Sequence, residues 1–298
     1  MLVVILSSLA GAQTSKFLIG GQTAKDGLRI PYRLFVPRNY DPKKAYPLVL
    51  ALHGAGERGT DDSIQLTTYR LATLWAVDSN QAKYPSFILA PQCPLYPAVW
   101  VNTPFGAGTY NQDKVPLAPP LRAVVEILDS MLIKYHIDTN RVYVAGLSMG
   151  GYATWDILMR YPKRFAAAIP ICGAGDTAKA ALLKAIPIWA FHGDADKTVP
   201  VEGSRQMIAA IRKAGGAPVY TEYPGVDHGS WGPALQEPKL ADWLFAQKRP
   251  APTAIRSAQS PRAHPERSRT GGIIPPGGGF RMPGASVDGL GREAARVK

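Results

Sequence analysis

Runs of consecutive apolar residues recur along the chain, and each run stops at a short segment of polar residues or glycine. The runs lie at residues 47–52, 87–90, 142–145, 165–171 and 186–191. Uninterrupted runs of this length are typical of strands that are covered on both faces, as in a parallel sheet. Residues 17–19, 28–37 and 219–223 also have strand character, so they are predicted as further strands.

Segments with helical spacing separate these strands. Apolar residues follow a helical period between 121 and 135, and further helices are predicted over residues 152–160, 177–184, 202–213 and 238–248. Strands that alternate with helices predict an α/β fold, with a mostly parallel central sheet flanked by helices. Only the 14 residues 173–186 separate two of the strands, which leaves no room there for a large lid domain.

The two ends of the chain differ from the middle. Residues 1–12 combine an apolar run with small residues, which predicts a secretory signal peptide, with a buried first strand as the alternative. That apolar run is too short to span a bilayer. Residues 250–298 are rich in Pro, Gly and Arg and are predicted to be a disordered tail. Residues 13–249 would then form the catalytic domain.

Charge and cysteine content narrow the possible functions. The net charge is +12, but residues 249–298 carry nine Lys or Arg and three acidic residues, which is half of that charge. The remainder is only mildly basic, so nucleic-acid binding is not predicted. Cys93 and Cys172 follow different, non-adjacent strands and are expected to be buried thiols. Neither has the spacing of a metal ligand, and no metal is predicted.

A G-x-S-x-G sequence lies where a predicted strand runs directly into a predicted helix. The strand covers residues 142–145, and Gly146 and Gly150 flank Ser148. A serine on a sharp strand-to-helix turn is the arrangement of a nucleophile elbow. The helix that begins there would direct its free amide groups and its positive dipole end toward a developing oxyanion.

A serine hydroxyl needs a base beside it, and the base needs a carboxylate that orients it. In the elbow arrangement the chain order is Ser, acid, His. Of the five histidines, only His228 follows the last predicted strand of the domain, so it is predicted as the general base. Asp194 and Asp196 both follow the strand that ends at residue 191. Asp196 is favoured because it lies further out on the loop, while Asp194 fits a turn residue.

The remaining parts of the site are predicted from two loops. The loop at residues 53–56 follows an early strand, and its Gly54 and Gly56 would let the backbone turn its amides toward the substrate. The oxyanion donors are predicted to be the backbone amides of Ala55 and Met149. The irregular stretch 92–118 is long enough to be functional, and its Trp100 is a candidate to stack on a substrate ring. The alternative is that Trp100 anchors the loop by packing.

Five motifs together resemble the predicted-esterase branch of the α/β-hydrolases. They are LHGAGERG (52–59), PQCP (91–94) with Trp100 downstream, GLSMGGY (146–152), PICG (170–173) and HGDADKTVP (192–200). This branch includes phospholipase/carboxylesterase-like enzymes, feruloyl and acetyl-xylan esterases and polyhydroxybutyrate-depolymerase-like proteins. The resemblance covers residues 28–246 and implies the α/β-hydrolase fold, with Ser148 as nucleophile, Asp196 as the acid and His228 as the base.

The resemblance also implies a secreted or periplasmic serine carboxylesterase that needs no cofactor. Its partner would be a small-molecule or polymer-borne ester, most directly a feruloyl or acetyl ester of a plant polysaccharide or an aromatic ester. The alternatives are a polyester depolymerase of the polyhydroxyalkanoate or terephthalate type, a prolyl-oligopeptidase-like peptidase, and a non-catalytic binding protein. The oligomeric state is not predicted.

Overall fold

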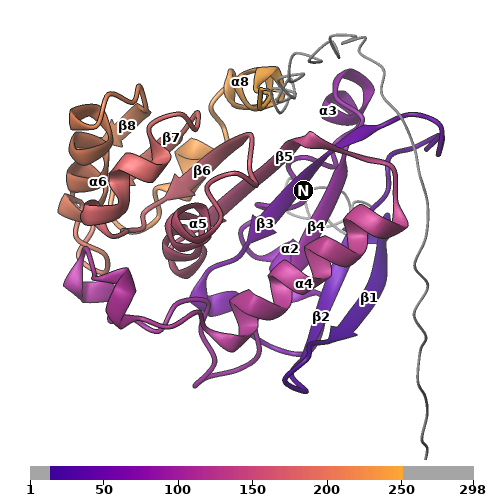
Figure 1. Cartoon of the computed structure of the whole chain (residues 1–298), viewed down its shortest axis with the longest axis horizontal. Helices are drawn as coiled ribbons and strands as arrows, with labels where there is room; N and C mark the ends of the chain where they lie inside the picture. Colours follow the sequence, from indigo (N-terminus) through magenta and orange to yellow (C-terminus); the bar gives the residue numbers. More distant parts are fainter. Residues whose placement is uncertain (1–13, 251–298) are drawn as a thin grey trace, which may run out of the picture. The chain divides into compact units, whose positions relative to one another are not determined.

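The computed structural model describes residues 14–250 (Figure 1). Residues 1–13 and 251–298 lie outside the described residues. The signal peptide expected at 1–12 and, apart from Pro250, the disordered tail expected at 250–298 therefore stay predictions.

A single sheet of eight strands forms the centre of the described chain, in the order β1-β2-β4-β3-β5-β6-β7-β8. The strands β1 and β2 pair in antiparallel fashion, as do β2 and β4, and all the remaining pairs are parallel. Their bounds are β1 Phe17–Thr23, β2 Arg29–Phe35, β3 Tyr46–Leu52, β4 Phe87–Pro91, β5 Ile137–Leu147, β6 Ala167–Ile171, β7 Trp189–Gly193 and β8 Val219–Tyr223. The predicted mostly parallel sheet is confirmed.

Helices cover both faces of the sheet, which is why its central strands are apolar throughout. Alternate residues of β3 enter two separate cores: Leu48 and Leu50 lie in one, and Val49 and Ala51 in the other. The first core is closed by α4 (Pro119–Lys134), α5 (Met149–Arg160) and α6 (Glu202–Lys213). The second is closed by α2 (Ile64–Thr67) and α8 (Leu240–Ala246). Figure 1 shows α4 and α5 lying across the same face of the sheet.

Several short elements were not predicted. They are the α-helices α2, α3 (Asp78–Lys83) and α7 (Trp231–Ala234), and the 3-10 turns η1 (Ala55–Glu57), η2 (Phe105–Ala107) and η3 (Gln112–Lys114). The segment predicted as a helix at 177–184 is instead a 3-10 element, η4 (Thr177–Leu183), and it is the only element between β6 and β7. No lid is therefore inserted between those two strands.

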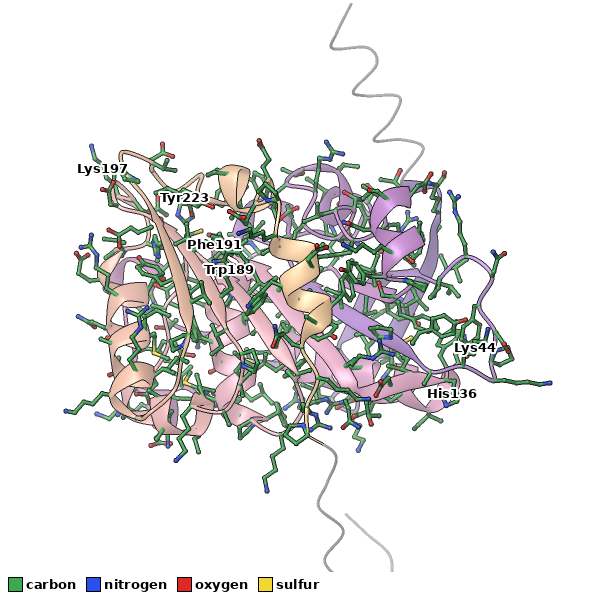
Figure 2. All side chains as sticks on the ribbon, turned by 90° about the horizontal axis from the view of Figure 1, so that it is seen from above. Lys44, His136, Trp189, Phe191, Lys197 and Tyr223 are labelled. Carbon is green, nitrogen blue, oxygen red and sulfur yellow. The ribbon has the colours of Figure 1, made fainter. Side chains whose placement is uncertain are left out.

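Aromatic side chains hold the two strands whose loops carry the candidate acid and base. The rings of Trp189 and Phe191 stack at 5.2 Å, and those of Phe191 and Tyr223 at 6.2 Å, so the row crosses from β7 to β8 (Figure 2). Such pairs add to the stability that apolar burial supplies. Within residues 14–250, no helix is both long and apolar enough to cross a membrane.

Candidate active site

Ser148 occupies a strained turn between β5 and α5. Its backbone has φ 54° and ψ −117°, a conformation that residues with a side chain rarely adopt. The crossing is so close that a Cβ at position 150 would lie 1.9 Å from the carbonyl oxygen of Leu52, and one at position 146 would lie 2.1 Å from the carbonyl oxygen of Gly150. Glycine is therefore required at both positions. The turn presents the serine side chain at the carboxyl end of β5.

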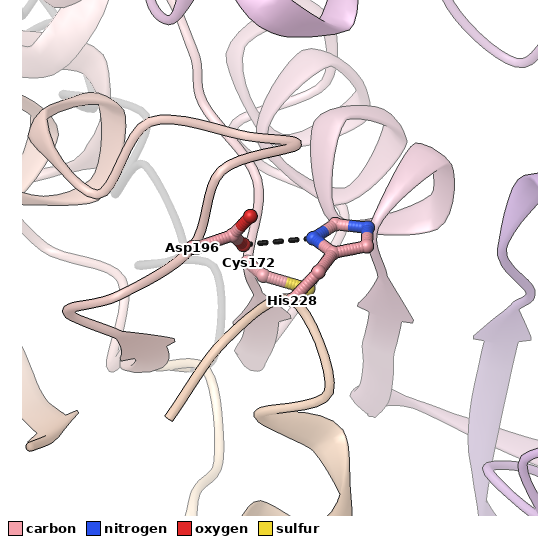
Figure 3. Close-up of side chains that lie close together, drawn as sticks. All are labelled: Cys172, Asp196 and His228. Carbon is pink, nitrogen blue, oxygen red and sulfur yellow. Dashed lines mark hydrogen bonds and ion pairs between the residues drawn. The ribbon is translucent and has the colours of Figure 1, made fainter. Parts of the chain in front are cut away.

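Three side chains from three separate loops meet at this turn. The Ser148 Oγ lies 2.8 Å from Nε2 of His228, and Nδ1 of His228 lies 2.7 Å from Oδ2 of Asp196 (Figure 3). An ionised carboxylate can only accept, so Nδ1 carries the hydrogen and Nε2 of the neutral ring is left to accept from the serine hydroxyl. The structure thus brings together the three residues that the chain order pointed to.

The neighbouring acid has a different position. The Asp194 Oδ1 accepts a hydrogen bond from the backbone amide of Gly225 at 2.6 Å. It therefore braces the beginning of the loop that carries His228, which agrees with its predicted role as a turn residue.

Asp196 is held ionised by its surroundings. Burial by itself disfavours the charged form, but hydrogen bonds from His192, His228 and the backbone amides of Val199 and Thr198 outweigh it and hold the pKa of Asp196 well below its usual range. His192 was not predicted as a site residue. Its buried ring lies behind the carboxylate, with Nε2 3.2 Å from Oδ2 of Asp196. Its place four residues before Asp196 in the same motif was the available signal.

The loop after β3 lies against the serine turn. A Cβ at position 54 would lie 2.8 Å from Cδ1 of Leu147 and 3.6 Å from the Cβ of Ser148, so Gly54 permits the close approach to the residue before the serine. Ala55 and Met149 are the first residues of η1 and α5, and amides at that position have no partner within their own helix. Both predicted oxyanion donors thus begin helical turns on segments that border Ser148.

A buried carboxyl group supports this loop and was also not predicted. The Glu57 Oε2 accepts a hydrogen bond from the Gly54 amide at 2.9 Å. Burial raises the pKa of Glu57 to about 8, although the backbone amides of Gly54 and Tyr69 act in the opposite direction. The uncharged acid therefore predominates at neutral pH.

Trp100 does not line the site. Its side chain is fully buried, and its indole Nε1 donates to the backbone oxygen of His53 at 3.1 Å. The indole also meets the ring of His53 edge-on at 5.2 Å. The expectation that Trp100 contacts substrate is therefore wrong, and the alternative, a packing anchor, holds. The indole N–H finds its hydrogen-bond partner inside the core, so Trp100 anchors the 92–118 loop beneath the loop of Gly54.

Both cysteines are buried free thiols, as expected. Cys172 lies beside the acid and base (Figure 3), and within the described residues its sulfur, a carboxylate oxygen of Asp196 and a ring nitrogen of His228 lie within 4.8 Å of one another. Burial raises the pKa of the Cys172 thiol to about 12, so on its own the sulfur stays protonated near neutral pH. The donor set therefore fits a packed thiol beside the imidazole.

Several known proteins are similar to this chain. Residues 117–235 match the family model described as the dienelactone hydrolase family. A probable carboxylesterase of Arabidopsis thaliana is 29% identical over 226 residues, which are 70% of this chain and 80% of that protein. A bifunctional acetylxylan esterase/xylanase of Neocallimastix patriciarum is 26% identical over 209 residues, which are 67% of this chain and 28% of that protein.

The crystal structure of a thermostable esterase superposes with a TM-score of 0.74 at 43% sequence identity, over 80% of this chain and 64% of that one. The chain thus spans less than two thirds of this esterase and of the acetylxylan esterase/xylanase. The fold and the site define a member of the α/β-hydrolase superfamily. Esterases recur among the proteins that this chain resembles, namely the carboxylesterase, the acetylxylan esterase/xylanase and the thermostable esterase.

Proposed function

We propose that the protein is a serine carboxylesterase that works through an acyl-enzyme. The observation that carries this proposal is the pair of contacts that join Ser148 to His228 and His228 to Asp196, at 2.8 and 2.7 Å. Those contacts supply what a serine hydroxyl lacks near neutral pH, namely a base and a carboxylate that orients it.

The proposed reaction has two halves. In the first, the Ser148 Oγ attacks the ester carbonyl carbon while His228 Nε2 takes the hydroxyl proton. The backbone amides of Ala55 and Met149 bind the oxyanion, and the alcohol leaves with the proton from His228. In the second half, water gives a proton to His228 and attacks the acyl carbon. The bond to the Ser148 Oγ then breaks, His228 returns the proton to that oxygen, and the carboxylic acid is released. Asp196 stays ionised throughout and stabilises the imidazolium that forms in each half.

The finer proposal concerns the substrate, which we place among acetyl and feruloyl esters of plant polysaccharides or among aromatic esters. The acetylxylan esterase named among the relatives supports the first group. A panel of acetylated xylan, feruloylated arabinoxylan, polyhydroxybutyrate and an aminoacyl amide separates this proposal from a polyester depolymerase and from a peptidase.

The mechanism is tested by Ser148→Ala. We expect turnover of p-nitrophenyl acetate to fall at least about 10⁴-fold, because removing the nucleophile alone costs about as much as removing the whole triad. A fluorophosphonate probe should label the parent protein and leave this variant unlabelled. Ser130→Ala, on helix α4, is the matched control. It should retain the turnover of p-nitrophenyl acetate and the labelling by the probe. Undiminished turnover by Ser148→Ala contradicts the assignment.

A further inference from the structure

A pocket of about 310 Å³ opens between the segment that follows α2 and the helix α7. Its walls are mostly apolar and include two aromatic rings and three aliphatic side chains: Tyr69, Trp231, Leu74, Val77 and Leu235. The polar members are Arg70 and Gln236, both exposed. Pockets of this size with apolar walls and few polar groups are typical of small-molecule sites.

Ring contacts connect this pocket to the proposed base. The indole of Trp231 meets the imidazole of His228 edge-on, at 5.3 Å between ring centres and an interplanar angle of 88°. Tyr69 also packs against Trp231, with the two ring centres 4.7 Å apart. Trp231 therefore lines the pocket and also contacts the proposed base.

The same wall also reaches the oxyanion loop. A Cβ at position 56 would lie 3.4 Å from the Tyr69 hydroxyl, and a Cβ at position 54 would lie 3.6 Å from the Cβ of Ser148. Contacts thus run from Ser148 through His228 and Trp231 to Tyr69, whose hydroxyl lies close to Gly56. The pocket wall formed by Tyr69 and Trp231 is therefore next to both the proposed base and the oxyanion loop.

Stereochemistry then decides which part of the ester faces the pocket. The tetrahedral carbon carries four groups: the serine oxygen, the oxyanion, the leaving oxygen and the acyl substituent. The oxyanion lies at the loop amides, and the leaving oxygen must lie at His228 to receive its proton. The acyl substituent points away from both. Trp231 lines the pocket and contacts the imidazole that protonates the leaving oxygen, so the pocket is on the side of the leaving alcohol.

We propose that this pocket binds the alcohol part of the ester and that the preferred alcohol carries an aromatic ring. Two aromatic side chains offer an edge or an offset face to such a ring, and the aliphatic walls cover the rest of it. A sugar ring would leave most of its hydroxyl groups against apolar walls, which costs free energy wherever a hydrogen bond is not replaced. This proposal rests on the proposed esterase function and selects aryl-alcohol esters within it.

Two isomeric esters test the proposal. Benzyl acetate carries its ring on the alcohol, and methyl phenylacetate carries the same ring on the acyl group. The pocket is narrowed from opposite walls by Leu74→Trp and, separately, by Leu235→Trp. Each should lower the ratio of kcat/KM for benzyl acetate to that for methyl phenylacetate by about tenfold or more, the scale of discrimination that an apolar pocket provides.

Leu182→Trp is the control, because Leu182 is 48% exposed on η4, away from the pocket walls, and it should leave the ratio unchanged. Thermal unfolding of all three variants identifies any that fail to fold, and either pocket variant alone suffices. An equal loss for both isomers overturns the proposal, as does a larger loss for methyl phenylacetate.

A further arm uses xylose tetraacetate, a small acetylated sugar. If its turnover by the parent protein exceeds that of benzyl acetate and falls in parallel with it in the narrowed variants, the pocket takes a sugar and the aromatic assignment is overturned. Failure of the esterase function itself has a different signature, since Ser148→Ala would then leave the turnover of every ester unchanged.

Discussion

Two loops of the molecule begin with the same pattern and hold their acids in opposite states. Residues 53–57 and 192–196 both read His-Gly-x-x-acid, and both lie at the ends of parallel strands, β3 and β7. In the first loop the acid is Glu57, whose pKa burial raises to about 8. In the second it is Asp196, whose pKa is held well below its usual range although burial acts against this.

The donors around each carboxyl group explain the difference. Asp196 accepts from two imidazoles, those of His192 and His228, and from two backbone amides. The equivalent imidazole in the other loop is not directed at its acid. The ring of His53 lies 2.7 Å from the Gly54 oxygen through Nδ1, and its Nε2 accepts from the Cys93 amide. A shared motif therefore does not determine ionisation; the number of hydrogen-bond donors directed at the carboxyl group does.

The largest expected effect comes from removing the charge in the second loop. Asp196→Asn should lower kcat/KM for p-nitrophenyl acetate by about 10³- to 10⁴-fold, because the imidazole loses the partner that fixes its tautomer and stabilises its charged form. Steady-state kinetics measures this. Asp194→Asn is the matched control two residues away and should change kcat/KM by less than about tenfold. Equal losses in the two variants would show that the loop, rather than the charge, is responsible.

Removing the acid of the first loop should instead change the pH dependence of stability. The pKa of Glu57 is raised in the folded protein. The stabilisation that its carboxyl group gives the folded state is therefore fully present below the pKa that Glu57 has in the unfolded chain, and it is lost as the pH rises through about 8. Glu57→Gln does not titrate. From about pH 5 to about pH 8, the parent should therefore lose about 3 kcal/mol more free energy of unfolding than the variant does.

Urea unfolding at the two pH values measures this difference. Glu202→Gln, at an exposed position on α6, is the control and should follow the pH dependence of the parent. Parallel curves for the parent and Glu57→Gln would contradict the raised pKa.

The direction of the histidine ring behind Asp196 is tested by His192→Phe. The hydrogen bond to the carboxylate is lost while a ring remains in the space, and we expect kcat to fall by about 10- to 100-fold, the size of a hydrogen bond to a charged group. KM should stay within about threefold, since the ring touches no substrate group in the proposed mechanism. His136→Phe, at an exposed histidine, provides the control. A change confined to KM would argue that His192 acts on binding.

The smallest effect is expected beneath the first loop. Trp100→Phe leaves the buried His53 carbonyl without its indole partner and should lower the free energy of unfolding by about 1–2 kcal/mol. The relative kcat/KM values for aromatic and acetyl esters should not change, because the indole is buried away from substrate. Thermal unfolding and the two substrates together measure this. A change in substrate preference would restore a binding role for Trp100.

The sheet could be predicted from the sequence because burial on both faces leaves a strong pattern. Val49 and Leu50 face different cores, so both must be apolar, and the run is visible without any knowledge of the fold. The choice of Ser148 followed from the G-x-S-x-G sequence between a strand and a helix, and that of His228 followed from chain order, since only this histidine comes after the last strand of the domain.

Other parts of the site could not be predicted because they depend on side-chain direction. The sequence places His53 and His192 in equivalent positions, and only the packed structure shows that one ring faces a backbone carbonyl and the other faces Asp196. Trp100 lies in an irregular loop whose composition allows either exposure or burial. Trp231 and Tyr69 are 162 positions apart in the sequence, so their contact follows from tertiary packing.

The close crossing at the serine turn also governs how this protein can evolve. Helix α5 approaches β3 so closely that a methyl group at position 150 would overlap the Leu52 carbonyl. Randomised libraries should therefore recover almost no sequence diversity at that glycine, whatever substrate is used for selection. New specificities are expected to arise by exchange of residues such as Leu74 and Leu235, where partly exposed side chains leave room for other shapes.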